Sequence, residues 1–235
     1  MKTRDKSQWI VVVFDLLLLL ALVYAFYPRI ALPNYISPGG DMVNLMLPAR
    51  YWAWHWLSRG IIPLWNPQTF GGVPFHGATQ AAVFYPPSLI LGSFVSPLAT
   101  INLLRFIHIY AFGAFTWLFL RCVRQLARPA ALLGAVAVAG SAHIASHTDH
   151  ANQLSAIAWL PALVACQWRW WQTGNPCLLV LFSLVLAFQV LAGHPQAFFY
   201  SMLLSAAIAG AWAWSEKAKG KRQKAEVRSP KSKVQ

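Results

Sequence analysis

Six stretches of this 235-residue chain are apolar enough and long enough to cross a lipid bilayer. A spanning helix needs about 20 mostly apolar residues, because the hydrocarbon core is roughly 30 Å thick. Only 11% of the residues are charged and 57% are apolar, a balance that a soluble domain of this size does not need. We therefore expect an all-α polytopic membrane protein with about six transmembrane helices. The candidate spans are residues 9–27, 98–120, 129–145, 154–170, 177–192 and 197–214.

The positive charges predict how these helices cross the membrane. Lys2, Arg4 and Lys6 precede the first span, and Lys and Arg accumulate on the cytoplasmic side of membrane proteins. Six alternating crossings then place fifteen of the nineteen basic residues on that side. We therefore expect both termini to be cytoplasmic. The net charge of +13 reflects this topology and attraction to anionic headgroups, so no nucleic-acid partner is expected.

The first loop, residues 28–85, is expected to be extracytoplasmic and holds most of the distinctive residues. Within it, residues 48–59 carry Trp and Tyr side chains around most of the circumference and should form a short helix at the membrane surface. Pro48 suits the first turn of such a helix, and Gly60 suits the position just past its end. The loop should therefore contain short interfacial helices.

Two further segments lack the pattern of a simple transmembrane span. Residues 81–95 are apolar, but a Pro-Pro pair and Gly92 interrupt them, so we expect a re-entrant or interfacial piece packed against protein. Residues 215–235 are polar and basic without periodicity and should form a disordered cytoplasmic tail. The expected organisation is a transmembrane domain at residues 1–214 followed by this tail.

The polar side chains divide between the two predicted faces. Six of the seven histidines fall on or near the outer face, as do Asp41 and Asp149. The predicted cytoplasmic loops contain little besides Arg, Lys and small residues. Reactive side chains on one face and anchoring charges on the other predict a catalytic or binding site that opens to the outside.

Short motifs follow one another in a fixed order along the predicted outer segments. They are Gly39-Gly40-Asp41, the Pro-Leu-Trp-Asn-Pro run after Gly60, Gln80-x-Ala-x-Phe-Tyr-Pro-Pro, the Trp-Leu-Pro triplet ending at Pro161, and Gly193-His-Pro-Gln. This series, over about residues 41–200, resembles the N-terminal part of the YfhO-type bacterial membrane proteins. Those proteins belong to the GT-C superfamily of glycosyltransferases.

The resemblance implies a reaction and a place for it. GT-C enzymes transfer a sugar from a polyprenyl phosphate to an acceptor hydroxyl on the outer face of the membrane, typically with inversion. The implied location is the bacterial cytoplasmic (inner) membrane, and the implied partners are a polyprenyl-phosphate-linked sugar, the lipid bilayer, and an acceptor glycan, polymer or lipid of the cell envelope. A hydroxyl needs a positioned carboxylate to take its proton, and a leaving phosphate needs cationic or N–H donors.

The resemblance and the predicted topology together give candidate site residues. Asp41 matches the position of the superfamily's carboxylate in the first outer loop, and Asp149 lies in the next outer loop, so we predict both to be catalytic. The predicted substrate-binding residues lie on the same side, with Arg105 within a span at a depth that suits a lipid phosphate. They are Arg50, Arg59, His76, Gln80, Arg105, His150, His194 and Gln196.

Each of these assignments has a structural alternative. Asp41 could cap a short helix, Asp149 could cap the fourth span, and Arg105 could extend its charge toward the membrane surface. His143, His147 and His150 have the i, i+4, i+7 spacing of one helix face, but the Glu of an HExxH metal site is absent. No metal ligand is therefore assigned, and a divalent metal stays an open alternative.

Three functions compete. The first is a GT-C glycosyltransferase, or the N-terminal fragment of one. The second is a non-catalytic or truncated membrane scaffold of the same family, which the chain length favours because family members are much longer. The third is a transporter or flippase, which is less expected because the spans carry few polar groups and show no inverted repeat.

Overall fold

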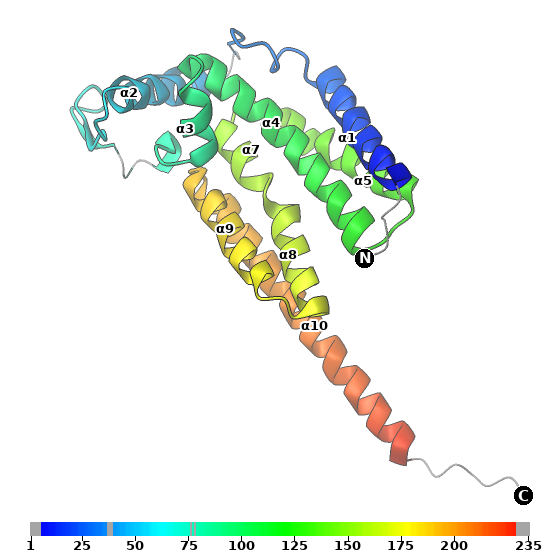
Figure 1. Ribbon diagram of the computed structural model, residues 1–235. Helices are drawn as coiled ribbons and strands as arrows, with labels where there is room; N and C mark the ends of the chain where they lie inside the picture. The colour runs from blue at the N-terminus through cyan, green and yellow to red at the C-terminus, as the bar shows by residue number, and fades with distance from the viewer. Residues whose placement is uncertain (1–5, 37–39, 76, 78, 229–235) are drawn as a thin grey trace, which may run out of the picture. The chain divides into compact units, whose positions relative to one another are not determined.

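The structure is a computed structural model that describes residues 6–36, 40–75, 77 and 79–228. The described chain is mostly helical, as expected for an all-α membrane protein (Figure 1). Four of its helical segments are long and apolar enough to cross a membrane: Trp9–Phe26, Pro97–Val123, Arg128–Ser146 and Pro195–Gly220. The chain divides into two compact units, Met1–Phe198 and Phe199–Gln235.

The helices and strands of the described chain follow one another in a single order. Their bounds are α1 Lys6–Phe26, the π-helical turn η1 Met42–Met46, α2 Leu47–Leu57, β1 Trp65–Asn66, β2 Val73–Pro74, the 3₁₀ turn η2 Thr79–Ala81, α3 Pro86–Gly92, α4 Pro97–Leu118, the π-helical turn η3 Phe119–Val123, α5 Arg128–Ala139, α6 Ala142–Ser146, α7 Ala151–Ile157, α8 Leu160–Thr173, α9 Cys177–Leu191 and α10 Pro195–Arg228. The strands β1 and β2 form an antiparallel hairpin.

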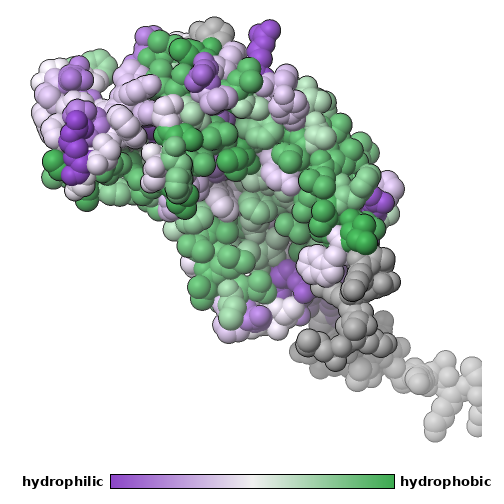
Figure 2. All heavy atoms as spheres, turned by 45° about the horizontal axis from the view of Figure 1, so that its top comes forward, coloured by the Kyte–Doolittle hydropathy of each residue, from purple (hydrophilic) through white to green (hydrophobic). Residues whose placement is uncertain are grey.

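Small residues allow α1, α4 and α5 to pack closely together. Ala131, Ala135 and Ala139 recur every four residues along α5 and are fully buried. Gly113 of α4 lies so close that a Cβ atom there would be 3.3 Å from the Ala135 carbonyl oxygen. In a bilayer, such small residues let helices gain van der Waals contact that lipid cannot provide. Apolar side chains cover most of the molecular face that Figure 2 shows, as expected of a lipid-facing surface.

An ion pair joins α1 to the start of α5. The Asp15 carboxylate is fully buried, and its Oδ1 accepts from Arg128 Nε at 2.8 Å and lies 2.6 Å from a second guanidinium nitrogen. A carboxylate within an apolar helix is costly unless a cation compensates it. Arg128 supplies that compensation, which explains how the first span can contain a charge.

The later predicted spans are less regular than the sequence suggested. The segment at 129–145 is divided between α5 and α6, and the segment at 154–170 is divided between α7 and α8. Pro161 lies in the first turn of α8, where it cannot donate the backbone hydrogen bond that would continue α7. With α8 of 14 residues and α9 of 15 residues, the six-span count stays a prediction.

The loop elements match the expected short helices. The helix expected near residues 48–59 is α2, and Gly60 follows it with φ +73°. The segment at 81–95 contains α3, which has seven residues. A helix of that length rises only about 10 Å, far less than the bilayer core. This helix is therefore too short to cross the bilayer alone, and the interfacial or re-entrant position of the segment stays a prediction.

The C-terminal part differs from the prediction. The sequence suggested a disordered tail from residue 215, whereas α10 continues as a helix through Arg228. Ala, Glu, Lys, Arg and Gln dominate this stretch, and all of them favour helix. Glu216 and Lys219 form an i, i+3 ion pair at 2.7 Å. Apolar periodicity does not indicate this helix, because a helix that is polar all round has none.

The turn between α9 and α10 packs directly on the loop before α3. Gly193 has φ +80°, and a Cβ atom placed there would lie 2.0 Å from the Thr79 carbonyl oxygen. Ala82 and Ala192 are buried in one cluster beside this contact. Only glycine allows the two backbones to approach so closely.

We predict that Gly193→Ala destabilises the protein far more than Gly174→Ala. Both glycines have positive φ, +80° and +65°, so both substitutions carry backbone strain of about 1–3 kcal/mol. A Cβ at position 174 has no neighbour within 4 Å, whereas one at 193 collides with Thr79. The free energies of unfolding of the two variants should therefore differ by about 1–3 kcal/mol, and this difference measures the steric cost of the collision with Thr79.

Thermal unfolding in detergent measures both variants against the parent. Equal shifts in the unfolding midpoint would mean that the turn does not pack on the Thr79 loop, and the close approach of the two segments would be wrong.

Candidate functional site

Arg105 of α4 is fully buried and joins that helix to the loop after α6. One of its terminal nitrogens donates to the Thr148 carbonyl oxygen at 3.1 Å, and the other donates to the Asn102 side-chain oxygen. The Asp149 carboxylate lies 3.9 Å from the guanidinium. A buried cation needs this combination of hydrogen bonds and a nearby anion to offset its lost hydration. Arg105 therefore fixes the position of the Thr148–Asp149 peptide.

Asn102 extends this network to the loop after α1. Its side-chain nitrogen donates to the carbonyl oxygens of Leu32, Pro33 and Tyr35 at 2.9, 3.1 and 2.9 Å. An amide group has two hydrogens, so the three acceptors share them. Because the Asn102 oxygen accepts from Arg105, one turn of α4 holds both loops.

Asp41 lies beside the same loop. Its carboxylate is 3.8 Å from His150 Nδ1, and His150 directly follows the Asp149 that faces Arg105. The next residue, Met42, is buried with Ile101 and Ala151, which fixes the chain at this point. The Asp41 side chain itself is 65% exposed. It is therefore anchored by its neighbour and open to a ligand.

The backbone of Asp41 does not have the geometry of a helix cap. Its φ and ψ angles are −65° and −34°, which are helical, and its carboxylate makes no capping hydrogen bond. A capping residue has non-helical angles and accepts from a backbone N–H group. The helix start thus gives no structural reason for a carboxylate at this position.

Several histidines gather around the Asp41–His150 pair. The rings of His143 and His147 are 4.4 Å apart, and those of His147 and His150 are 5.7 Å apart. Burial lowers the pKa of His194, and the nearby His150 and His147 lower it further. Within the residues that the structure describes, no group of three or more His, Cys, Asp or Glu side chains is placed to hold a metal ion.

The other predicted substrate-binding residues divide into two groups. Arg50 is buried and bonded within the protein: it donates to Ser88 Oγ at 2.6 Å, to Asn152 Oδ1 at 3.0 Å and to the Ala82 carbonyl at 3.4 Å. Asn152 also donates to the backbone oxygen of Gln80, so position 80 joins this network through its main chain. Burial lowers the pKa of Arg50 to about 10.

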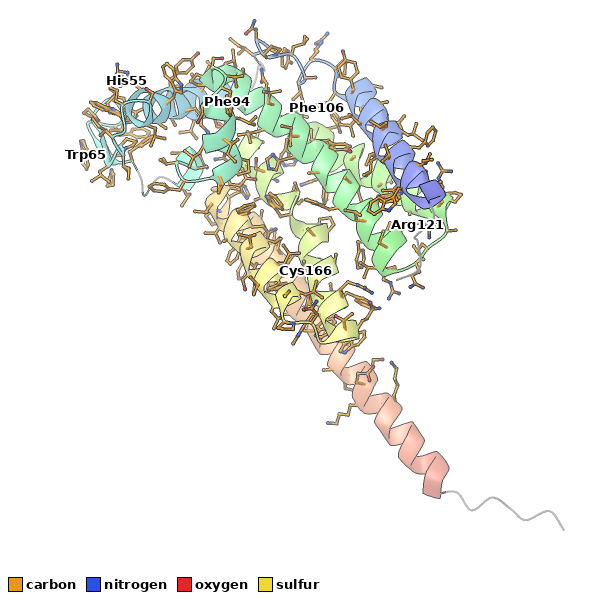
Figure 3. The ribbon with its side chains drawn as sticks, viewed as in Figure 1. His55, Trp65, Phe94, Phe106, Arg121 and Cys166 are labelled. Atoms are coloured by element: carbon orange, nitrogen blue, oxygen red, sulfur yellow. The ribbon has the colours of Figure 1, made fainter. Side chains whose placement is uncertain are left out.

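None of the described contacts joins the remaining candidates to Asp41. Arg59 is exposed after α2 and donates to the His55 carbonyl oxygen. His55 and Trp65 mark the part of α2 and the hairpin that extends away from the long helices (Figure 3). Gln196 is exposed in the first turn of α10, beside His194. His76 lies outside the described residues.

A buried chain of hydrogen bonds that the sequence did not predict connects the loop before α3 to α4. Trp159 Nε1 donates to the Tyr85 hydroxyl at 2.9 Å, and that hydroxyl lies 2.5 Å from His108 Nε2. His108 Nδ1 is 2.6 Å from the Leu104 carbonyl oxygen, which can only accept. Nδ1 therefore carries the hydrogen, and Nε2 accepts from Tyr85. The sequence feature that could have indicated this chain of hydrogen bonds is His108, a histidine inside an apolar span.

Comparison with family models, with curated proteins and with solved structures found no match for this chain. The assignment of a function therefore depends on the geometry of the site and on the motif resemblance.

We predict that His194 makes the protein less stable at mildly acidic pH. Its pKa is lowered in the folded state, whereas an unfolded histidine titrates near 6.5. Below about pH 6.5 the unfolded chain therefore binds the proton first, and the free energy of unfolding falls as pH falls. His194 Nδ1 also accepts from the Ala197 backbone N–H at 3.1 Å, a bond that protonation of Nδ1 removes.

The variant His194→Asn tests this, because Asn keeps an acceptor for the helix start and does not titrate. Unfolding midpoints at pH 7.5 and 5.5 should differ less for His194→Asn than for the parent, while the exposed His55→Asn should behave as the parent. An unchanged pH dependence in His194→Asn would show that His194 is not held neutral.

Proposed function

We propose that the protein is a membrane glycosyltransferase, or the N-terminal part of one, that uses a polyprenyl-phosphate sugar donor. The acceptor is a hydroxyl group of an envelope glycan, polymer or lipid, outside the bacterial cytoplasmic membrane. The observation that carries the proposal is the exposed Asp41 carboxylate, 3.8 Å from His150. The motif resemblance supplies the reaction class, and the geometry of this pair supports the role of the carboxylate.

In this proposal Asp41 is the general base. The acceptor hydroxyl gives its proton to the carboxylate while its oxygen bonds to the anomeric carbon of the sugar. The bond from that carbon to the phosphate oxygen breaks, and the electron pair leaves with the polyprenyl phosphate. A carboxylate that is 65% exposed and makes no capping bond is free to accept such a proton. His150 orients it from the neighbouring loop.

Arg105 has a different role from the phosphate contact that the sequence suggested. Its side chain is fully buried and bonded to Thr148 and Asn102, so it acts as a positioning residue for the loop that carries Asp149 and His150. Asp149 is 29% exposed in that loop, which leaves it accessible to an acceptor. We retain Asp149 as the second catalytic candidate.

The proposed topology has six spans, cytoplasmic termini and an extracytoplasmic loop at residues 28–85. The proximity of Asp41 to His150 supports it, because residues that touch outside the bilayer must be separated by an even number of crossings. Between them lie α4 and α5 with α6, two crossings, and no third span is needed from the seven-residue α3. The contact of Gly193 with Thr79 supports two more crossings before α10.

One observation favours the alternative of a non-catalytic scaffold. Arg105, the buried cation beside the predicted site, directs its hydrogen bonds to groups of the protein itself. An enzyme that stabilises a leaving phosphate keeps donors available for it. Under the scaffold alternative, the loops at this end of the helices bind a partner and Asp41 transfers no proton.

We predict that Asp41→Asn lowers sugar transfer by about 10²-fold or more while leaving the unfolding midpoint unchanged. Asn has the size of Asp but cannot accept the proton, and no capping bond is lost. The measurement is transfer of labelled sugar from a polyprenyl phosphate in membranes. Asn44→Ala, an exposed polar change in the turn after Asp41, is the matched control and should keep the parental rate. Transfer at the parental rate in Asp41→Asn would support the scaffold.

A further inference from the structure

A cavity of about 600 Å³ lies between α2, α3 and the start of α4. None of the residues of the Asp41–His150 and Arg105–Asp149 pairs lines it. Most of its wall is apolar, with Trp54, Leu57 and Leu89 among the lining side chains. Its buried polar lining residues are Arg50, Ser88 and Thr100. The cavity thus combines a cationic part with apolar walls.

No carboxylate among the described residues forms an ion pair with Arg50. All three of its hydrogen bonds go to neutral acceptors, namely Ser88, Asn152 and the Ala82 carbonyl. The ion pairs of the described side chains lie elsewhere, with Arg128, His150, Arg105 and Lys219 as the cations. A buried guanidinium without an anion is costly, and it stays charged at neutral pH even with its lowered pKa. No carboxylate of the described residues therefore balances the positive charge in the cavity.

A second donor lies beside the guanidinium. Ser88 Oγ accepts from Arg50 at 2.6 Å, and its own hydroxyl hydrogen has no acceptor in the described part of the chain. Thr100 uses its hydrogen on the Ser96 carbonyl at 3.0 Å. A planar guanidinium and an adjacent hydroxyl donor are a combination that suits phosphate oxygens.

We propose that this cavity binds the phosphate headgroup of an anionic membrane phospholipid. The phosphate lies against Arg50 and Ser88, and the acyl chains follow Trp54 and Leu89, which are 44% and 39% exposed. The described lining residues include no Asp or Glu, so they offer the ammonium group of a zwitterionic lipid no partner, and a lipid such as phosphatidylglycerol is preferred. This inference goes beyond the proposed sugar transfer, and no step of that reaction uses the cavity.

Phospholipid binding to the purified full chain tests the inference. Native mass spectrometry in mixed micelles counts bound phosphatidylglycerol or phosphatidylcholine as each lipid is titrated. The parent should bind one phosphatidylglycerol saturably and prefer it over phosphatidylcholine. Arg50→Gln should weaken that binding by about tenfold or more, since a charge-assisted hydrogen bond is lost. Arg59→Gln removes an equal charge from the same segment outside the cavity lining and should bind as the parent.

A second variant keeps the test decisive if Arg50→Gln does not fold. Gly92 lines the cavity, and a Cβ there would lie at an ordinary contact distance of 3.8 Å from Thr100 Oγ1. Gly92→Leu therefore occupies cavity space without touching the bonds of Arg50, and it should lower phosphatidylglycerol binding as well.

Four outcomes would overturn the proposal. They are equal binding of the two phospholipids, parental binding in Gly92→Leu, displacement of phosphatidylglycerol by millimolar inorganic phosphate, and displacement by an equal amount of polyprenyl phosphate. The last two would make the cavity a free-phosphate site or a donor site. Asp41→Asn should bind phosphatidylglycerol as the parent does, so a failure of sugar transfer and a failure of lipid binding are distinguishable.

Discussion

The buried guanidinium of Arg105, a residue of α4, determines how the loops at one end of the helices are arranged. The guanidinium donates hydrogen bonds to the Thr148 carbonyl oxygen and to the Asn102 side-chain oxygen. The Asn102 side-chain nitrogen in turn donates to three carbonyl oxygens of the loop after α1. A charge so deeply buried is tolerated only when its donors are satisfied, so the two loops cannot move away without a large cost. The hydrogen bonds that this one buried charge requires thus hold two loop segments, distant in sequence, against the same turn of α4.

The candidate site follows from that arrangement. Asp149 faces Arg105 and His150 faces Asp41, so two consecutive residues connect the buried network to the exposed carboxylate. The burial of Met42 against Ile101 and Ala151 holds the other side. Asp41 is therefore held from both sides while its own carboxylate stays exposed, which is the arrangement that a positioned general base requires. The Asp15–Arg128 pair joins α1 and α5 independently of this network.

The sequence predicted what depends on composition and local pattern. Apolar length predicted α1 and α4, and the Pro48 and Gly60 pattern predicted α2, because these signals are local. It did not predict that Asn102 contacts Leu32–Tyr35, because nothing near an Asn in a span indicates which distant carbonyls it will bond. The same applies to Gly193, whose glycine requirement comes from a backbone more than one hundred residues away. The polar helix after residue 215 has no apolar periodicity, so that pattern did not predict it.

We propose that Asp41 and His150, which lie side by side, are outside the membrane. The most direct measurement is cross-linking of Asp41→Cys to His150→Cys by a short, membrane-impermeant bifunctional thiol reagent added outside intact cells. The background protein has its native cysteines Cys122, Cys166 and Cys177 replaced. We expect efficient cross-linking of this pair and none for His55→Cys with His150→Cys, since His55 lies further along α2. Absence of the Asp41–His150 cross-link, or its formation only after the cells are permeabilised, would contradict this position of the two residues.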